Sequence, residues 1–381
     1  MYCSIVHTTV GHIPPILDIY PAFVRPFLSG GAPPTVDSWR LPPRSERGQS
    51  PRGRGGGPAG LQGRAGVAGM AAGAAGAGRL KVALLQLGVS ADKARNLAAA
   101  RGALEAAARQ GARLAVLPEM WNCPYSNDSF GPYAEELEAA GGDPGGRPSP
   151  GASPSLELLQ QAARELGLAV VGGSVPERDA GGRLFNACPL IQASSGHLLG
   201  VYRKTHLFDI DIPGKITFRE SDTLTQGPGG LVLPEGEMGP GMPGLGVGIC
   251  YDLRFPELAQ SYARRGARLL VFPGAFNTTT GPEHWRLLLR ARAVDNQCFV
   301  AACSPARNPS GEGYQAWGHS MIVGPFGEVL CEAAETPSTI IAELDLAQVD
   351  ERRRNMPLEQ QRRRDLYEVL DRMGGADGCA P

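Results

Sequence analysis

The sequence predicts an α/β protein, and two observations support this prediction. From about residue 80 onward, short apolar runs that are typical of buried strands alternate with stretches of helical periodicity. In addition, the segment 111–118 (GARLAVLP) returns as 266–273 (GARLLVFP), and each copy follows a predicted helix and ends at a proline. Eight-residue matches of common apolar residues do occur by chance, but this one keeps its flanking elements. It therefore indicates two similar β-α-β halves. Alternation alone would suggest a doubly wound sheet.

In the first half, turn and cap residues set the limits of the elements. Gly167 ends a helix for which Ser155 is the predicted N-cap. A Ser-Ser-Gly turn separates two apolar runs, which predicts an antiparallel pair. The predicted strands are 80–87, 113–117, 168–174, 184–192 and 198–204, and the predicted helices are 91–110 and 155–166.

In the second half, an apolar run ends at Cys250 and a helix begins at Pro256, a residue that the first helical turn tolerates. Cys250 therefore stands at a strand-to-helix corner, where a thiol can be exposed near backbone N–H groups. The predicted strands are 246–249, 268–272, 298–304, 319–323, 327–333 and 339–344, and the predicted helices are 256–265 and 282–296.

Composition excludes several classes of protein. The formal net charge is −1, so no nucleic-acid partner is implied. No run of about 18 apolar residues occurs, so we expect neither a transmembrane helix nor a membrane partner. The cysteines show no CxxC spacing and the histidines are scattered singly. We therefore expect free thiols in a reducing compartment, with no metal and no cofactor.

Residues 1–78 do not resemble a folded segment. They are rich in Gly, Ala, Arg and Pro, and they cannot bury enough surface to offset the entropy of ordering, so we predict a disordered extension. The segment contains arginine but no lysine, a bias that mitochondrial transit peptides share, yet no amphipathic arginine helix is evident. We expect a cytoplasmic protein, with a mitochondrial location as the alternative. If the extension has no role, Met70 is a more natural initiator methionine.

Three reactive side chains come directly after predicted strands. Glu119 follows LAVLP, Lys204 follows LLGVYR and Cys250 follows GVGI. Taken singly, each has an ordinary explanation: a carboxylate at a helix start, a surface charge and a small buried hydrophobe. Taken together they indicate a site, because we expect the strand ends to meet at one rim of the sheet, where α/β proteins place their chemistry.

The three groups form a coherent catalytic set. The thiol needs a base to become a nucleophile, and Glu119 can accept the proton if burial raises its pKa. The ammonium of Lys204 can stabilise the thiolate and then the oxyanion of a tetrahedral intermediate. The sequence therefore predicts nucleophilic catalysis by Cys250 without the help of a histidine.

Five segments resemble the nitrilase superfamily of carbon–nitrogen hydrolases, and within it they look most like the omega-amidase branch. The similarity extends from about Leu80 to Tyr367, and the three reactive residues all stand in their family contexts. The segments are 117–125 (LPEMWNCPY), 202–221 (YRKTHLFDIDIPGKITFRES), 248–258 (GICYDLRFPEL), 273–285 (PGAFNTTTGPEHW) and 317–329 (WGHSMIVGPFGEV).

This resemblance implies a four-layer α-β-β-α sandwich of the nitrilase type over residues 79–350. It also implies a homodimer, since members of the family usually pair across a helical face. The C-terminal tail, 351–381, is expected to pack on the domain or on the dimer partner. Leu366 and Tyr367 are its candidate anchors.

The resemblance also implies the roles of the site residues. The catalytic cysteine of the family, its nucleophile, falls on Cys250. The proton acceptor falls on Glu119, and the residue that stabilises the oxyanion and donates a proton falls on Lys204. A second, supporting glutamate falls on Glu220, and the backbone N–H of Tyr251 is expected to complete the oxyanion hole.

The implied reaction is hydrolysis of the terminal amide of 2-oxoglutaramate or 2-oxosuccinamate, through a cysteine thioester, to the 2-oxo dicarboxylic acid and ammonia. Such a substrate carries a carboxylate remote from the amide. Its pocket therefore needs a cation, and Arg254 can clamp a carboxylate bidentately. Tyr125 and Thr279 are expected to complete the polar end of the pocket. The ordinary alternative for Arg254 is a salt bridge to Asp252 or Glu257.

Three features qualify the match to the omega-amidase branch. Met120 stands where that branch often has a cysteine, and the loop 141–153 is longer than expected, which costs little stability. Phe255-Pro256 is also a feature of the branch that hydrolyses deaminated glutathione. The rival functions are therefore a deaminated glutathione amidase and a non-catalytic interaction protein on the same fold, and the intact reactive trio argues against the second.

Overall fold

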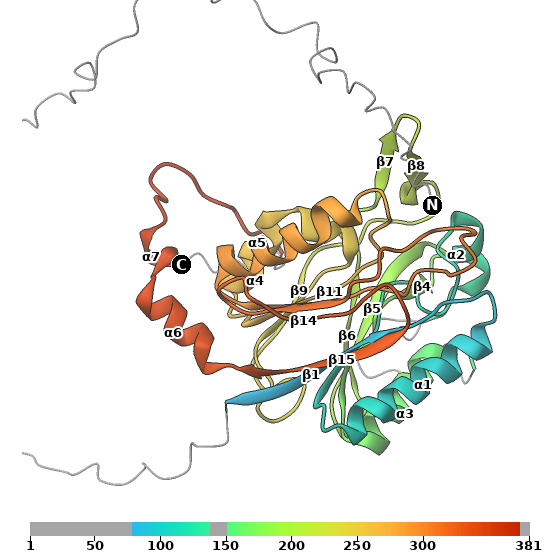
Figure 1. Cartoon of the computed structure of the whole chain (residues 1–381), viewed down its shortest axis with the longest axis horizontal. Coiled ribbons are helices and arrows are strands. Elements are labelled where there is room, and N and C mark those ends of the chain that lie inside the picture. Colours follow the sequence, from blue (N-terminus) through green and yellow to red (C-terminus); the bar gives the residue numbers. More distant parts are fainter. Residues whose placement is uncertain (1–77, 138–150, 374–381) are drawn as a thin grey trace, which may run out of the picture. The chain divides into compact units, whose positions relative to one another are not determined.

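The computed structural model describes residues 78–137 and 151–373 of the 381-residue chain. Two β-sheets lie face to face between two layers of helices, in the order helix, sheet, sheet, helix (Figure 1). The predicted four-layer α-β-β-α sandwich is therefore confirmed. The extension predicted for 1–78 lies outside the described residues except for its last residue, and so does most of the loop 141–153.

The first sheet contains seven strands: β1 (Arg79–Gln86), β2 (Leu114–Val116), β3 (Ala169–Val171), β4 (Val175–Arg178), β5 (Leu184–Ile191), β6 (Leu198–Arg203) and β15 (Ser338–Asp345). Their order is β15-β1-β2-β3-β5-β4, and β6 also pairs with β5. Strands β1, β2 and β3 run parallel, and the remaining pairs are antiparallel.

The second sheet contains six strands: β9 (Leu231–Leu233), β10 (Leu245–Val247), β11 (Leu269–Pro273), β12 (Phe299–Cys303), β13 (Met321–Val323) and β14 (Val329–Glu332). Their order is β14-β13-β12-β11-β10-β9, with β10, β11 and β12 parallel. A separate hairpin is formed by β7 (Asp209–Ile212) and β8 (Ile216–Arg219).

The helices complete the outer layers. In Figure 1, helices α1 (Lys93–Arg109) and α3 (Pro154–Leu166) lie below the sheets, and helices α4 (Pro256–Arg264) and α5 (Arg286–Asn296) lie above them. No helix in the described ranges is long and apolar enough to cross a membrane. These four are the main helices. The shorter helices are α2 (Asn127–Tyr133), α6 (Ala347–Asn355) and α7 (Leu358–Gln361).

The side chains of β1 explain how the layers hold together. Val82 and Leu84 pack in the apolar core shared with the second sheet, whereas Ala83 and Leu85 pack in a second core with residues of α1 and α3, such as Leu104. All of these side chains are fully buried. Successive residues of a strand point to opposite faces, so an uninterrupted apolar run is what a strand buried on both faces requires.

The internal repeat is confirmed as two β-α-β units, but they belong to different sheets. In one unit β1, α1 and β2 form a parallel pair with its crossover helix, and in the other β10, α4 and β11 do the same. A single doubly wound sheet, which alternation alone suggests, is therefore wrong. Each half builds its own sheet, and the two sheets bury each other's inner faces.

Several element boundaries differ from the sequence prediction. Helix α3 begins at Pro154, so its N-cap is Ser153 and not Ser155. A π-helical turn, Gly281–Trp285, precedes α5 where one continuous helix was predicted. The β7–β8 hairpin was not predicted, because its strands are only four residues long and half exposed, which leaves no clear apolar alternation.

The C-terminal tail returns to the domain after α7. Arg265, the residue that caps the C-terminal end of α4, forms an ion pair with Asp371 at 2.6 Å, and Met373 packs against the core. Leu366 and Tyr367 remain exposed, at 68% and 61%. Their role as anchors on a partner stays a prediction.

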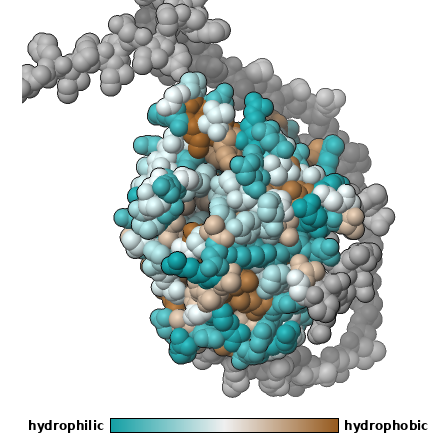
Figure 2. Space-filling model, turned by 90° about the vertical axis from the view of Figure 1, so that its right-hand side faces the viewer, coloured by the Kyte–Doolittle hydropathy of each residue, from teal (hydrophilic) through white to brown (hydrophobic). Residues whose placement is uncertain are grey.

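Figure 2, which views the molecule from the right-hand side of Figure 1, shows apolar patches set among polar residues on that face.

Candidate active site

The three reactive residues come from both sheets. Glu119 follows β2 and Lys204 follows β6, both in the first sheet, whereas Cys250 begins a 3₁₀ turn (Cys250–Arg254) after β10 in the second. The expectation that they meet at the rim of one sheet is therefore wrong. They meet where the ends of the two sheets come together, because each half of the chain contributes its own strand ends.

Lys204 lies at the centre of a buried ion cluster. Its Nζ is 2.9 Å from Oε1 of Glu119 and 2.9 Å from Oε2 of Glu220. All three side chains are 0% exposed. A buried ammonium between two carboxylates is expensive to desolvate unless it is fully paired, so the arrangement indicates a functional cluster rather than a surface charge.

Hydrogen-bond donors from three other segments of the chain fix the carboxylate of Glu119. Its Oε1 accepts hydrogen bonds from Lys204 and from Nδ2 of Asn186, at 2.9 and 2.8 Å. Its Oε2 accepts one from the backbone N–H of Ala275 at 2.7 Å. Ala275 follows the proline that ends the second repeat copy, and Glu119 follows the proline that ends the first. The two repeat ends therefore meet in this hydrogen bond.

Glu220 is fixed just as firmly. It begins a short 3₁₀ turn after β8, and its Oε2 accepts a hydrogen bond from the N–H of Phe208 at 2.7 Å. Its Oε1 accepts one from the hydroxyl of Tyr125 at 2.7 Å, and Asn186 approaches the same oxygen at 3.4 Å. Glu220 therefore has little freedom to rotate away from Lys204.

Cys250 occupies a corner between a strand and a helix, as the sequence predicted, but it is buried rather than exposed and its backbone is strained. Its φ is +48°, a left-handed conformation that costs free energy for any residue other than glycine. The residue is only 3% exposed. Gly274 makes room for the corner, since a Cβ at Gly274 would lie 3.1 Å from the Cα of Cys250 and 3.2 Å from the ring of Trp285.

Burial sets the protonation states of the trio. Burial raises the pKa of Glu119. The charge of Lys204 lowers this pKa and the charge of Glu220 raises it, and the pKa stays above its ordinary value. Burial, followed by the charge of Glu119, raises the pKa of the Cys250 thiol well above its usual range. Burial alone would lower the pKa of Lys204, but Glu119 and Glu220 raise it above its ordinary value. Lys204 therefore stays an ammonium and Cys250 a thiol that needs a base.

Two cavities adjoin this cluster. Both are lined by Tyr125 and Tyr314, whose rings stack with centroids 4.5 Å apart. The first cavity, of about 210 Å³, reaches Glu119. The second, of about 380 Å³, is lined by Thr279 and Lys215. A small ligand in either cavity would lie against the tyrosine pair.

A family model described as carbon-nitrogen hydrolase matches residues 81–354. The chain belongs to the carbon–nitrogen hydrolase family. It is 53% identical over 293 residues to the chloroplastic omega-amidase of Arabidopsis thaliana, a match covering 77% of this chain and 75% of the plant protein. It is 46% identical over 289 residues to omega-amidase NIT2 of Homo sapiens, covering 76% and 97%.

Among solved structures, this carbon–nitrogen hydrolase is similar to Saccharomyces cerevisiae Nit3, a member of branch 10 of the nitrilase superfamily. The two share 41% sequence identity with a TM-score of 0.66, over 75% of this chain and 97% of the yeast protein. The identity and the structural match together confirm the superfamily that the motifs indicated.

The residues predicted to bind substrate in this hydrolase do not all lie together. Tyr125 lines both cavities and Thr279 lines the second. Arg254 lines neither: its guanidinium lies over the ring of Phe276, at 4.6 Å from the centroid, and Nη1 is 3.0 Å from Nδ1 of His284. Tyr251 lines neither cavity and is half buried.

Arg254 has no ion pair with Asp252 or Glu257 within residues 78–137 and 151–373, so the ordinary alternative for this residue is wrong. Its Nε is buried without a hydrogen-bond partner in that part of the chain. A buried donor that lacks a partner costs free energy, so Arg254 retains the capacity to bind an acceptor.

Sequence reasoning missed two residues of the site. Asn186 lies within the apolar strand β5, where a lone amide in a buried run was the available signal, since buried polar groups need partners. Tyr314 lies in a glycine-containing loop between strands, and nothing in its neighbours marks it. Burial raises its pKa well above the usual range, and its hydroxyl donates to the carbonyl of Ala275.

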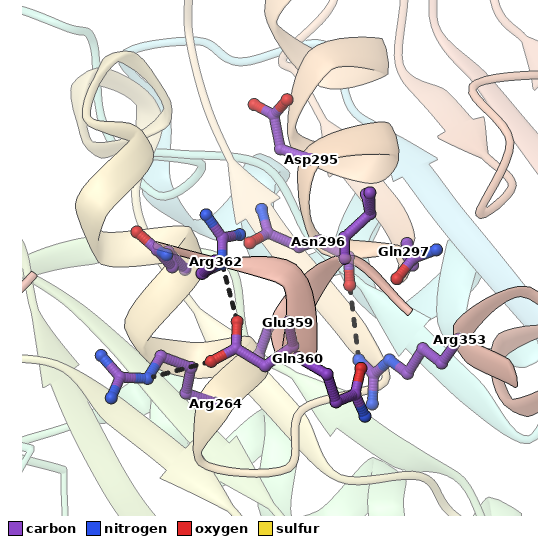
Figure 3. Close-up of a pocket in the computed structure, with 11 residues that line it drawn as sticks. Arg264, Asp295, Asn296, Gln297, Arg353, Glu359, Gln360 and Arg362 are labelled. Carbon is purple, nitrogen blue, oxygen red and sulfur yellow. Dashed lines mark hydrogen bonds and ion pairs between the residues drawn. The ribbon is translucent and has the colours of Figure 1, made fainter. Parts of the chain in front are cut away.

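A third cavity, of about 230 Å³, lies at the C-terminal ends of α4 and α5, whereas Cys250 precedes the N-terminal end of α4 (Figure 3). Its cations are already engaged, because Arg264 and Arg362 both contact Glu359 and Arg353 donates to a backbone carbonyl. This cavity contains no nucleophile. In the part of the chain that the structure describes, no cluster of His, Cys, Asp and Glu could hold a metal ion.

Proposed function

We propose that this chain is an omega-amidase that hydrolyses the terminal amide of 2-oxoglutaramate and 2-oxosuccinamate. The observation that carries the proposal is the buried contact of Lys204 with Glu119 and Glu220 beside the strained Cys250 corner. Relatives named omega-amidase, at 53% and 46% identity, support the choice of substrate. No metal or cofactor has a part in the proposed reaction.

In the first half of the reaction, Cys250 attacks the amide carbon while Glu119 accepts the thiol proton. The carbonyl oxygen becomes an oxyanion, which the ammonium of Lys204 and the backbone N–H of Tyr251 stabilise. Glu119 then gives its proton to the amide nitrogen, the C–N bond breaks and ammonia leaves. The product of this half is a thioester on Cys250.

In the second half, Glu119 takes a proton from water, which attacks the thioester carbon. The C–S bond breaks, the acid leaves and the thiolate regains its proton from Glu119. Because the carboxylate acts in both halves, its position must not change between them. The hydrogen bonds from Ala275 and Asn186 supply that constraint.

The pH dependence of the enzyme is expected to report Glu119. Burial raises the pKa of this carboxyl above the ordinary 4.5, and only its ionised form accepts a proton. Activity is therefore lost as the pH falls through the raised pKa, so the acidic limb of kcat/KM should lie above 4.5. A limb at or below that value in a pH–rate profile would contradict the proposed role.

Arg254 is the proposed clamp for the remote carboxylate of the substrate. Substitution R254Q is expected to raise KM for 2-oxoglutaramate about tenfold with a smaller change in kcat, since it removes binding energy shared by ground and transition states. An aliphatic amide without the remote carboxylate is the matched substrate, and its KM should not change. Equal effects on both substrates would remove Arg254 from the carboxylate site.

A direct comparison of substrates tests the proposed function. The purified protein should hydrolyse 2-oxoglutaramate with a higher kcat/KM than deaminated glutathione, and mass spectrometry should detect an acyl adduct on Cys250. An equal or reversed preference would favour the deaminated glutathione amidase. If neither substrate gives turnover or adduct, the non-catalytic alternative is favoured.

A homodimer is the proposed assembly. Leu287 and Val294 of α5 are 63% and 45% exposed, and Phe326 and Leu330 nearby are 53% and 40% exposed. Exposed apolar groups of this size on one helix are typical of an interface. L287D is expected to shift the protein from dimer to monomer in light scattering after gel filtration. A monomeric wild-type protein would exclude the proposal.

The cytoplasm is the proposed location, with an organelle as the alternative. The lysine-free, arginine-containing segment 1–78 supports the alternative, as does a plant relative named chloroplastic. Fusion of 1–78 to a fluorescent protein separates the two, since diffuse fluorescence supports the cytoplasm and organellar fluorescence excludes it.

A further inference from the structure

Asp252 is a buried carboxylate that the proposed reaction does not use. It lies in the 3₁₀ turn that begins at Cys250, and it is 1% exposed. The sequence suggested Arg254 as its partner, but its oxygens are occupied elsewhere. Four hydrogen-bond donors from two separate segments surround it.

The two oxygens of Asp252 are both fully used. Oδ2 accepts hydrogen bonds from the N–H of Ile249 at 2.8 Å and from the hydroxyl of Tyr202 at 2.7 Å. Oδ1 accepts one from the N–H of His206 at 2.9 Å and lies 2.7 Å from Nδ1 of the same residue. An ionised carboxylate only accepts hydrogen bonds, so this contact assigns the donor role to Nδ1 of His206.

These donors flank the catalytic groups. Ile249 directly precedes Cys250, whereas Tyr202 and His206 stand on either side of Lys204. The two segments belong to different sheets, and no strand pairing joins them: β6 pairs with β5, and β10 pairs with β9 and β11. The carboxylate of Asp252 therefore hydrogen-bonds the segment of the nucleophile to the segment of the ammonium, and the ring contacts of His206 with Phe255 and of Phe208 with Tyr251 lie beside it.

We propose that Asp252 is a positioning residue that sets the separation of Cys250 from Lys204. The proposal depends on the catalytic roles assigned above to these two residues. The proposal predicts that position 252 requires a carboxylate, and that a neutral side chain of the same size is not sufficient. The reason is that all four groups facing the two oxygens are hydrogen-bond donors.

The isosteric amide shows why the charge matters. Asparagine has one acceptor oxygen and one NH₂ donor. If its oxygen faces His206, its NH₂ opposes the N–H of Ile249 and the nucleophile corner loses its contact. If its oxygen faces Ile249, its NH₂ opposes the N–H of His206 and the Lys204 segment loses its contact. Either orientation of D252N releases one of the two segments.

The test combines kinetics with the reactivity of the thiol. D252N is expected to lower kcat for 2-oxoglutaramate about 100-fold with KM changed less than about threefold, since misplacement of reacting groups acts on the chemical step. Alkylation of Cys250 by iodoacetamide, followed on its peptide by mass spectrometry, should slow and shift to higher pH. A thiolate farther from the Lys204 ammonium is less stabilised.

Glu135 provides a matched control. It is another buried carboxylate, 2% exposed, with contacts to Ser155, Asn122 and Lys93. E135Q removes a comparable set of contacts outside the reacting groups. It should lower the melting temperature while the kcat of the folded protein and the alkylation profile stay at wild-type values.

The outcomes separate the alternatives. If D252N lowers the melting temperature as E135Q does but keeps wild-type kcat and alkylation, the proposal is overturned. If D252N does not fold, Y202F and H206Q each remove part of the contact set, and the proposal fails when both show wild-type kcat and alkylation. If the wild-type protein lacks omega-amidase activity, the proposed function fails, whereas the alkylation comparison still tests Asp252.

Discussion

C250A is expected to abolish turnover of 2-oxoglutaramate, reducing kcat by about 10⁵-fold or more, because it removes the thiol that is proposed to form the thioester. The loss should appear in kcat and not in KM. The corner itself should keep its shape in C250A, because the close approach of Gly274 is to the Cα of Cys250 and not to its sulfur. Steady-state kinetics and mass spectrometry of the mixture with substrate measure the effect.

The control for this variant is another cysteine of the same protein. Cys331 of β14 is partly exposed and lies outside the cluster. C331S should keep wild-type kcat and the acyl adduct on Cys250, whereas C250A should lose the adduct and keep the wild-type melting temperature within a few degrees. Turnover by C250A above about one-thousandth of the wild-type rate would exclude covalent catalysis at this residue.

E119Q is expected to lower kcat by about 10³- to 10⁴-fold, because the amide has the shape of the carboxylate but cannot accept a proton. The Lys204 ammonium keeps its contact with Glu220, at 2.9 Å, so the cluster does not lose all of its pairing. The acidic limb of the pH–rate profile should disappear together with the activity. Both effects are measured in one series of kcat/KM against pH.

E220Q serves as the comparison for E119Q. Both changes remove one charge beside Lys204, but only Glu119 is proposed to transfer protons. E220Q should therefore lower kcat by a smaller factor, about 10- to 100-fold, and retain the acidic limb. A larger loss for E220Q than for E119Q would reverse the roles of the two glutamates.

Local patterns in the sequence predicted much of the fold and of the site. The apolar runs of β1, β5, β11 and β12 and the amphipathic stretches of α1 and α4 were found at nearly their observed positions, because burial on a sheet imposes a pattern within each segment. The reactive trio was noticed for a related reason, since each member is a charged or thiol group that directly follows an apolar run.

The sequence could not show how distant segments meet. The hydrogen bond of Ala275 to Glu119 joins residues 156 positions apart, and that of Lys204 to Glu119 joins residues 85 positions apart. Contacts over such separations depend on the number of sheets and on how they face each other. Asn186 and Tyr314 escaped notice for the same reason, and Asp252 was considered only as a partner of Arg254.

By itself the sequence predicted the alternating elements, the repeat and the family, and it supplied the proposal for the nucleophile, its base and its ammonium. Only the tertiary structure decided that two sheets rather than one bring these groups together, and that Asp252 joins the turn after Cys250 to the segment of Lys204. The physical reason is that periodicity records which face of a segment is buried. It does not record which donor from another segment satisfies a buried acceptor, because that pairing exists only once the layers have packed.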